Sequence, residues 1–254
     1  MNSPSFSTAP GSAARTSSPT VAVIIPVLDE AAWLNTCLPE LLERHGFDEI
    51  IVVDGGSTDK SVEVVCKHLP PDASSAWPVL RLSQSARGRA RQMNAGAQMA
   101  EANVLLFLHA DTTLPPDAAE HVRESIRDEY LWGRFDVRLS GRHALFRVVE
   151  RLMNWRSAAS GIATGDQGLF VRRDLFRVFG GFAPLPLMED IDLSRRLKWA
   201  GKPARRRETV VTSSRRWEER GILRTILLMW TLRFLYWAGV SPARLARWYE
   251  HRSR

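Results

Sequence analysis

The sequence is poor in cysteine. Two cysteines, Cys37 and Cys66, occur among 254 residues, which is too few for a disulfide scaffold or a cysteine-bound metal cluster. Both fall in segments with helical periodicity, where we expect them to be small, buried apolar side chains. This scarcity fits a reducing compartment, and we predict a cytoplasmic protein.

Signals for secretion and for membrane spanning are also missing. The first twenty residues are rich in Ser, Ala, Pro and Thr and have no apolar core, so we predict residues 1–19 to be a disordered tail rather than a signal peptide or an anchor. The apolar segment 222–239 contains Arg224 and Arg233 and is too short and too charged for a comfortable membrane span.

Negative charge is in deficit. Lys and Arg number 35 against 28 Asp and Glu, a net charge of +7, and the excess arginine is concentrated in the last third of the chain. This balance favours acidic partners such as nucleoside diphosphates or anionic lipid surfaces. Nucleic acid is not expected, because the sequence has no helix-turn-helix, zinc-finger or RNP-type signature.

Apolar runs of strand length alternate with helical patterns in the first half of the chain. The runs are 21–27, 49–53, 79–82 and 104–108, and the helical segments that follow them are 31–42, 62–69, 87–97 and 116–129. Four such steps predict a parallel, right-handed wound α/β sheet over residues 20–130, with the strand order left open.

Polar residues follow these runs, at the edge of an open α/β sheet where ligands bind. Asp54 precedes Gly55 and Gly56, which let the backbone approach a ligand closely. The pattern is not Gly-x-Gly-x-x-Gly, so a nicotinamide enzyme is a poor fit. Asp111 ends the run His109-Ala110-Asp111; it either holds a divalent cation against a diphosphate or caps a turn.

Further charged candidates lie at predicted helix starts and in a glycine-bracketed loop. Arg87 and Arg91 could neutralise a diphosphate, or belong to a solvated basic turn. Asp166 precedes the apolar run 169–171 and lies either beside a substrate or in a hairpin turn. Glu189 and Asp190 open a helix that stops at Gly201, and the helix dipole there favours ionised carboxylates.

Two more elements are predicted between these candidates. Residues 132–139 alternate in the manner of a half-exposed strand, and residues 144–155 follow as a helix.

Four motifs, taken together, resemble those of the nucleotide-sugar-dependent family 2 glycosyltransferases, which have the GT-A fold. The motifs are Val23-Ile24-Ile25-Pro26-Val27-Leu28-Asp29-Glu30, Val53-Asp54-Gly55-Gly56-Ser57-Thr58-Asp59, Asn94-Ala95-Gly96 and His109-Ala110-Asp111. The resemblance covers roughly residues 20–200. It implies a mostly parallel GT-A sheet and an inverting transfer from a nucleoside diphosphate sugar to an acceptor hydroxyl.

The resemblance also implies roles for particular residues. The Asp-x-Asp that holds manganese or magnesium stands here as His109-Ala110-Asp111, so Asp111 is the metal ligand, and His109 is either a nitrogen ligand that favours manganese or lies outside the metal shell. Asp54 is assigned to the nucleotide base. The residues predicted to bind the donor are Pro26, Glu30, Asp54, Arg87, Arg91, Asn94, Ala110, Asp166, Arg216 and Trp217.

The Glu189-Asp190 pair resembles the acceptor-activating element of the family. Asp190 is the predicted general base and Glu189 the second candidate. The run Ser213-Ser214-Arg215-Arg216-Trp217 is similar to the Gln-x-x-Arg-Trp of processive members but lacks the Gln, which argues against a polymerising synthase. Arg215 and Arg216 can still reach the diphosphate, and Trp217 can stack on a sugar or on the acceptor.

We therefore predict a glycosyltransferase domain over 20–217 and an amphipathic helical region over 218–254. That region either docks on the core or lies on an anionic membrane. In the second case the enzyme would be peripheral on the inner face of the cell membrane, and its acceptor could be a lipid or lipid-linked molecule. One alternative is nucleotidyl transfer to a sugar phosphate. That activity would require a glycine-rich, lysine-bearing loop directly after the first strand, and residues 26–30 contain no such loop. Another is a non-catalytic nucleotide- or membrane-binding module.

Overall fold

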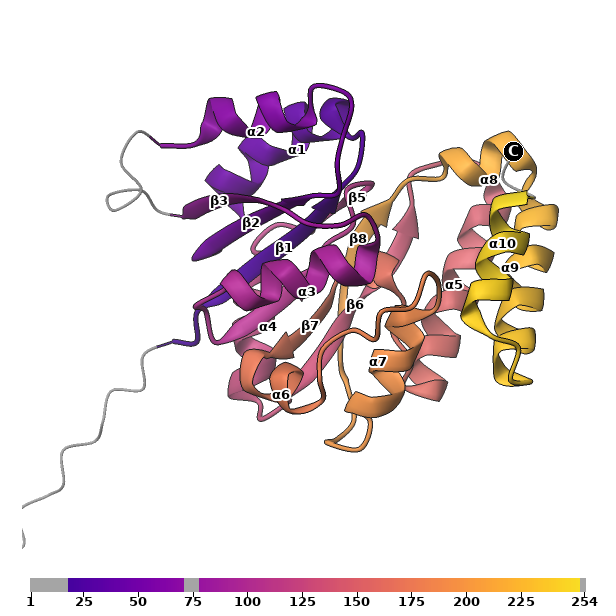
Figure 1. Cartoon of the computed structure of the whole chain (residues 1–254). Helices are drawn as coiled ribbons and strands as arrows, with labels where there is room; N and C mark the ends of the chain where they lie inside the picture. The colour runs from indigo at the N-terminus through magenta and orange to yellow at the C-terminus, as the bar shows by residue number, and fades with distance from the viewer. Residues whose placement is uncertain (1–17, 71–77, 252–254) are drawn as a thin grey trace, which may run out of the picture.

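The computed structural model describes residues 18–70 and 78–251 (Figure 1); the predicted tail lies almost wholly outside them. The described strands form one eight-stranded sheet in the order β3-β2-β1-β4-β7-β6-β8-β5. Their bounds are β1 Val21–Val27, β2 Glu49–Asp54, β3 Val79–Gln84, β4 Val104–Phe107, β5 Thr112–Thr113, β6 Trp132–Leu139, β7 Leu169–Arg172 and β8 Ala204–Thr212. Strands β3, β2, β1 and β4 are parallel, which confirms the predicted wound sheet.

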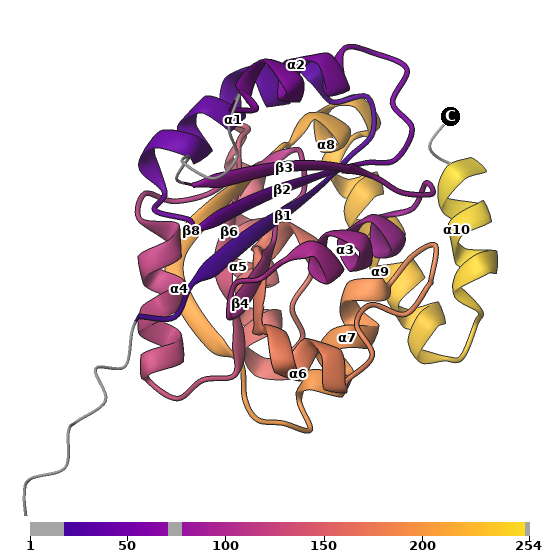
Figure 2. The same cartoon turned by 60° about the vertical axis from the view of Figure 1, so that its left-hand side comes forward.

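Helices cover both faces of this sheet (Figures 1 and 2). The helices are α1 Ala31–Arg44, α2 Ser61–His68, α3 Arg89–Met99, α4 Ala118–Arg127, α5 Ala144–Ser160, the 3₁₀ turn η1 Gly165–Gln167, α6 Arg173–Val178, α7 Glu189–Leu197, α8 Arg215–Arg220, α9 Ile222–Trp237 and α10 Pro242–His251. Helices α1, α2 and α4 pack on one face, and α3, α6 and α7 pack on the other.

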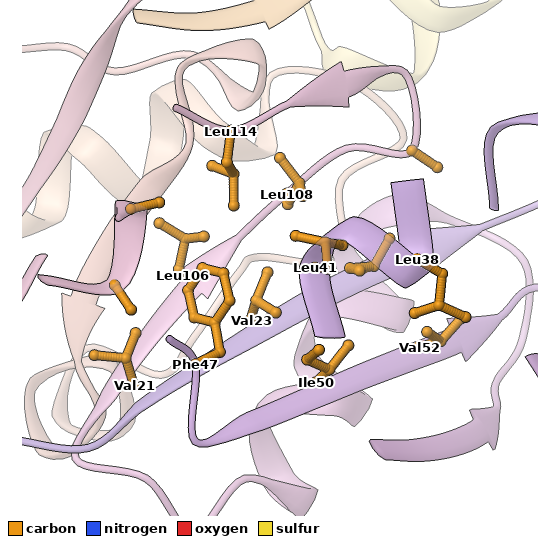
Figure 3. Packing of buried hydrophobic residues seen from close by; sticks show 14 of the residues in the cluster. Val21, Val23, Leu38, Leu41, Phe47, Ile50, Val52, Leu106, Leu108 and Leu114 are labelled. Carbon is orange, nitrogen blue, oxygen red and sulfur yellow. The ribbon is translucent and has the colours of Figure 1, made fainter. Parts of the chain in front are cut away.

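Strand β1 lies at the centre of the core because both of its faces are covered. Val21, Val23 and Ile25 point to the α1 side, where Figure 3 shows Val23 near Leu41 and Leu106. The alternate residues Ala22 and Ile24 point to the α3 side. Full burial of both faces explains why this strand is a continuous apolar run rather than an alternating one.

The second half of the sheet is mixed, and this arrangement assembles the site. Strand β7 runs antiparallel to both β4 and β6, whereas β8 runs parallel to β6. The residues that precede β7 therefore lie at the same edge as those that follow β4 and β8. Asp166, Asp111 and Ser213 come together at this edge although they are far apart in the sequence.

Two predictions about exposure are wrong. Strand β6 is almost wholly buried rather than half-exposed, because its polar members Arg134 and Asp136 pair with each other inside the protein at 2.7 Å. Alternating polarity here reflects a buried ion pair and not a solvated face. Cys37 is buried as expected, but Cys66 is exposed, because it lies on the outer side of α2.

The C-terminal helices pack against the core through one face. Leu232 of α9 and Leu245 of α10 form a buried cluster with Met188 and Ile191 at the start of α7. Within the described residues, no helix is both long and apolar enough to cross a membrane.

Candidate functional site

A cavity of about 270 Å³ lies between the strand ends and helices α5, α7 and α9. Acidic and basic side chains from six separate segments line it. These side chains are Arg89, His109, Asp111, Arg156, Asp166, Glu189, Asp190 and Arg233. The structure thus brings together both predicted metal ligands, both candidates for the base, and Asp166.

The loop after β4 is fixed from two sides. The Thr112 amide donates to the His109 carbonyl at 3.0 Å, and the Ser213 amide donates to the Asp111 carbonyl at 2.9 Å. The Asp111 side chain is partly exposed and faces the cavity. Helix α4, which follows, has its N-cap at Asp117, so Asp111 lies in the loop before that helix.

Gly165 packs directly against the predicted metal-ligand loop. A Cβ atom at Gly165 would lie 2.1 Å from Cε1 of His109, so this position requires a glycine if the imidazole is to stay where it is. The η1 turn is also closed by a capping box between Thr164 and Gln167. The segment is therefore a 3₁₀ turn between α5 and β7 and not a hairpin turn.

Asp166, carried by this turn, is a perturbed carboxyl group. Burial raises its pKa, and the nearby charge of Asp111 raises it further, while Arg156 and Arg89 act in the opposite direction. Because the carboxylates of Asp111 and Asp166 repel one another, a cation bound between them would lower the energy of both ionised groups.

Asp190 is held by backbone amides on both oxygens. Its Oδ2 accepts from the Gly165 amide at 2.7 Å, and its Oδ1 accepts from the Ile191 amide at 2.7 Å. Burial, followed by the charge of Glu189, nevertheless raises the pKa of Asp190 to about 7. The helix dipole was expected to keep this carboxylate ionised, but burial outweighs that effect.

Glu189, the second candidate, is more deeply placed. Its side chain is buried, and burial raises its pKa against the opposing charge of Arg89. A base for neutral pH should titrate near neutrality while touching the cavity. Asp190, which is partly exposed, meets that description better than the buried Glu189.

Three arginines that line the cavity, Arg89, Arg156 and Arg233, were not among the predicted site residues. Arg89 lines the cavity, whereas the predicted Arg87 and Arg91 are exposed and lie outside the described lining. The cluster Arg87-Gly88-Arg89-Ala90-Arg91 identified this helix start as a candidate site. Which of its three arginines faces the cavity depends on the rotation of the helix, which the sequence does not give. Arg156 was missed because the helix was expected to end at Trp155, one residue before it, whereas α5 continues to Ser160.

Arg156 is an incompletely satisfied cation. One Nη donates to the Ser157 hydroxyl at 2.9 Å, but the buried Nε has no hydrogen-bond partner among the described residues. Burial lowers its pKa, and the charges of Asp166 and Asp190 oppose that shift. Because Arg156 lines the cavity, its guanidinium charge is suited to an oxygen-rich ligand.

Asp54 lies at the end of β2, outside the cavity lining. Its buried carboxylate accepts from the amides of Gly56 at 3.0 Å and Ser57 at 3.1 Å. At Gly55 a Cβ atom would meet the Gln92 amide group at 2.9 Å. This turn is thus packed tightly, and the assignment of Asp54 to the nucleotide base stays a prediction.

Four other predicted donor-binding residues, Pro26, Glu30, Asn94 and Ala110, are also outside the lining. Pro26 and Ala110 are buried, and Glu30 is partly buried after β1. The Asn94 amide exchanges hydrogen bonds with the backbone of Phe182 at 2.8 and 2.9 Å, tying α3 to the segment before α7. Their contact with a donor stays a prediction. For Asn94 the structure shows a different role, because its side chain holds α3 against the segment that contains Phe182.

The arginine-tryptophan motif is partly represented. Trp217 lines the cavity and packs against the buried cluster of Leu139, Phe146 and Val149, whereas Arg215 is exposed. The prediction for the Arg216 side chain lies outside the described part of the structure.

Comparisons with known proteins identify the family of the chain. Residues 22–178, more than half of the chain, match Glycosyl transferase family 2. The PGL/p-HBAD biosynthesis glycosyltransferase of Mycobacterium bovis (strain BCG / Pasteur 1173P2) is 33% identical over 171 residues, which cover 65% of this chain and 63% of that protein. An uncharacterized glycosyltransferase of Haemophilus influenzae is 28% identical over 106 residues, 40% of each chain. The chain thus spans less than two thirds of the curated relatives' length.

Solved structures share the fold. The mannosyltransferase PcManGT from Pyrobaculum calidifontis, in complex with GDP-Man and Mn²⁺, superposes with a TM-score of 0.59 at 22% identity and covers 77% of this chain and 57% of that one. S. aureus TarS 1–349 in complex with UDP gives a TM-score of 0.56 at 17% identity, covering 76% and 60%. The predicted GT-A type fold is confirmed. With the family match over 22–178, the chain belongs to the family 2 glycosyltransferases.

Proposed function

We propose that this protein transfers a sugar from a nucleoside diphosphate sugar to an acceptor hydroxyl with inversion, using Asp190 as the general base. The observation that carries the proposal is the position of a carboxyl group with a pKa of about 7 in the same cavity as Asp111 and His109. A base of this kind can take a proton near neutral pH, and a single base is what a one-step inverting transfer requires.

A divalent cation, Mn²⁺ or Mg²⁺, fits the Asp111 end of the cavity. The described residues contain no group of three or more His, Cys, Asp or Glu side chains arranged to hold a metal by themselves. Such ions at a diphosphate need only one or two protein ligands, because phosphate oxygens and waters supply the rest. Asp111 and His109 would be these ligands. When bound, the cation would supply Lewis-acid neutralisation of the leaving diphosphate.

The chain's own residues would do the remaining work. Asp190 would accept the proton of the acceptor hydroxyl, with its oxygens oriented by the amides of Gly165 and Ile191. Arg89 and Arg156 would offset negative charge on the donor. The apolar wall from α5 and α9 would exclude water from the reacting groups.

The test is a turnover measurement. Purified protein with a panel of nucleoside diphosphate sugars and Mn²⁺ should release nucleoside diphosphate only when an acceptor is added. Release of pyrophosphate from a nucleoside triphosphate and a sugar phosphate would instead favour a nucleotidyltransferase. Donor binding without any turnover would favour a binding module. A thermal-shift screen of the same sugars identifies the donor, because a ligand that binds the native state raises its apparent stability.

Asp111→Asn should abolish most of the Mn²⁺-dependent gain in donor affinity while changing the free energy of unfolding little. The side chain is partly exposed at the cavity, and asparagine keeps its size but not the charge that attracts a cation. Titration of donor with and without Mn²⁺ measures the effect. An unchanged response to Mn²⁺ would remove Asp111 from the proposed metal site.

Arg156→Gln should move the pH profile of transfer to higher pH. The positive charge of Arg156 interacts favourably with the Asp190 carboxylate, so its loss should raise the pKa of the base further. Arg156→Lys keeps the charge and should restore the profile at least in part. If the glutamine variant loses activity without any shift in the profile, Arg156 acts on the substrate rather than on Asp190.

The proposed place of action is the cytoplasm, with peripheral attachment to the inner face of the cell membrane. Exposed arginines after α9, among them Arg244 and Arg247, support this location through attraction to anionic lipids.

A further inference from the structure

Helix α9 carries an apolar stripe that nothing in the described structure covers. Its members are Leu223, Leu227, Trp230, Phe234 and Trp237, each between 63 and 73% exposed. Spacings of four and three residues place them on one side of the helix. The opposite side packs on the core through Leu232. Five large exposed apolar side chains in one line differ from the scattered single ones of an ordinary surface.

Helix α5 carries a second stripe beside the same cavity. Its members are Leu145, Val148, Leu152 and Trp155, between 40 and 68% exposed. Leu152 and Trp155 of α5, and Trp230 of α9, are at once largely exposed and part of the cavity lining. The cavity therefore opens between the two stripes, on the side of the molecule where α5, α9 and α10 stand together (Figure 1). We call the two stripes the docking face.

Arginines surround this face. Because successive helix residues are rotated by about 100°, Arg224 and Arg233 lie on opposite sides of the α9 stripe, and α9 contains no acidic residue. Arg151 of α5 is exposed, as are the arginines of α10. An apolar stripe with aromatic side chains and flanking arginines suits an anionic lipid surface. A twofold contact with a second copy would instead place this arginine-bordered face against an identical one.

The cavity changes character along its length. Asp190 and most of the other charged groups come from the strand ends and from α3, α5 and α7, whereas the wall formed by α9 and the middle of α5 is apolar apart from Arg233 and Thr225. This wall includes Val149, Met153, Ile226, Met229 and Leu232. A site with an apolar body and a few polar groups at one end suits a ligand with a hydrocarbon part and a hydroxyl head.

We propose that the docking face rests on an anionic membrane and that the apolar part of the cavity receives the hydrocarbon chain of a lipid acceptor, whose hydroxyl then reaches Asp190. The inference rests on the proposed function for the reaction but adds the acceptor class, its route of entry and the participation of α5.

Membrane docking is tested on the full chain with the triple variant Leu227→Ser, Phe234→Ser, Trp237→Ser. None of these side chains lines the cavity. Co-flotation with vesicles of phosphatidylcholine and phosphatidylglycerol should fall by about tenfold or more, because each change removes apolar surface from the membrane contact. Trp199→Ser is the matched control, since Trp199 is 88% exposed outside the docking face, and it should float like the wild type.

The salt dependence separates the two parts of the contact. Wild-type binding should weaken between about 0.01 and 0.5 M NaCl and should be weaker on pure phosphatidylcholine, because the arginine attraction is screened. Binding that is equally strong on both vesicle types would overturn the anionic-surface proposal.

The chain-binding part is tested with bromoundecanol, a hydroxyl-ended chain whose bromine quenches tryptophan fluorescence. Trp155, Trp217 and Trp230 line the cavity, so quenching should saturate, and Ile226→Gln should weaken it several-fold. Bromopropanol at the same concentration should quench little. Equal quenching by both alcohols, or no effect of Ile226→Gln, would contradict a hydrocarbon site.

These measurements need no sugar donor, so their failure is distinguishable from failure of the proposed reaction. Vesicle binding and saturable quenching without any turnover would refute only the proposed function. A dimer in solution that the triple variant dissociates would show that a second copy covers the face, which would overturn the membrane proposal.

Discussion

Asp190→Asn is expected to reduce transfer to the acceptor by a factor of about 10² or more, the usual scale of general-base assistance. Asparagine has the size of aspartate and can still accept from one of the two amides, Gly165 or Ile191, that hold the carboxylate. It cannot take up a proton. Donor affinity should stay close to that of the wild type, because the substitution leaves Asp111, Arg89 and Arg156 in place.

The pH dependence of the wild-type rate provides the second readout. Because the base must be ionised and its pKa is raised to about 7, the rate should rise through pH 7 and level off above it. The residual rate of Asp190→Asn should lack this inflection. Glu189→Gln is the matched comparison. If Glu189→Gln abolishes transfer while Asp190→Asn does not, the base is Glu189. If neither variant loses transfer, the general-base mechanism proposed for this pair is wrong.

Stability should change with pH in the opposite sense to activity. Below about pH 4 Asp190 is protonated in both the folded and the unfolded chain, so it contributes no difference. Between pH 4 and 7 the unfolded chain loses this proton first, which lowers the free energy of unfolding as pH rises. Asp190→Asn removes the effect, and its stability relative to wild type should therefore increase over that interval. Urea unfolding at several pH values measures it.

The central strands could be predicted because a strand that is buried on both faces appears in the sequence as a continuous apolar run. The run 21–27 coincides with β1, and its neighbours β2 and β4 follow the same rule. Asp111 could be identified because a carboxylate directly after such a run must lie at the ligand-binding edge. The place of Asp166 could not be derived in this way, because it depends on β7 running antiparallel between β4 and β6.

The missed arginines show a different limit. Arg89 and Arg156 are single charged residues on helices, and which way they face depends on helix phase and on the neighbouring elements. Three arginines near the start of α3 look equivalent in sequence, yet only Arg89 lines the cavity. The outer stripe of α5 was missed for a similar reason, because an apolar side chain on a helix is ordinarily taken as core.

Strand β6 shows the opposite error, in which a polar pattern concealed burial. Arg134 is 1% exposed, and its Nη1 donates to Asp136 at 2.7 Å and to the Phe135 carbonyl at 3.0 Å. Burial acts to raise the pKa of Asp136, but hydrogen bonds and charge from Arg205 and Arg134 outweigh it and hold that pKa below its usual range. Charged residues at alternate positions can therefore point inward where they satisfy one another.

Asp136→Asn is accordingly expected to lower the free energy of unfolding by roughly 3–5 kcal/mol, the usual cost of leaving one member of a buried ion pair without its partner. The variant keeps the shape of the side chain but leaves the Arg134 guanidinium buried without a carboxylate. Asp174→Asn is the matched control. Asp174 pairs with Arg172 on the surface, and its loss should cost less than about 1 kcal/mol. Urea unfolding of the two variants measures the difference.

A double variant distinguishes an unpaired charge from a general packing defect. If the cost of Asp136→Asn comes from the stranded Arg134 cation, then Arg134→Met in the same chain should recover part of the lost stability, because it removes the charge and keeps much of the apolar stem. If packing is the cause, the second substitution should add its own loss to the first. Arg134 also donates to the Asn154 carbonyl at 3.3 Å, and Arg156 follows two residues later on α5. If this contact helps to position Arg156, Asp136→Asn should also lower transfer, and the double variant should recover stability without recovering transfer.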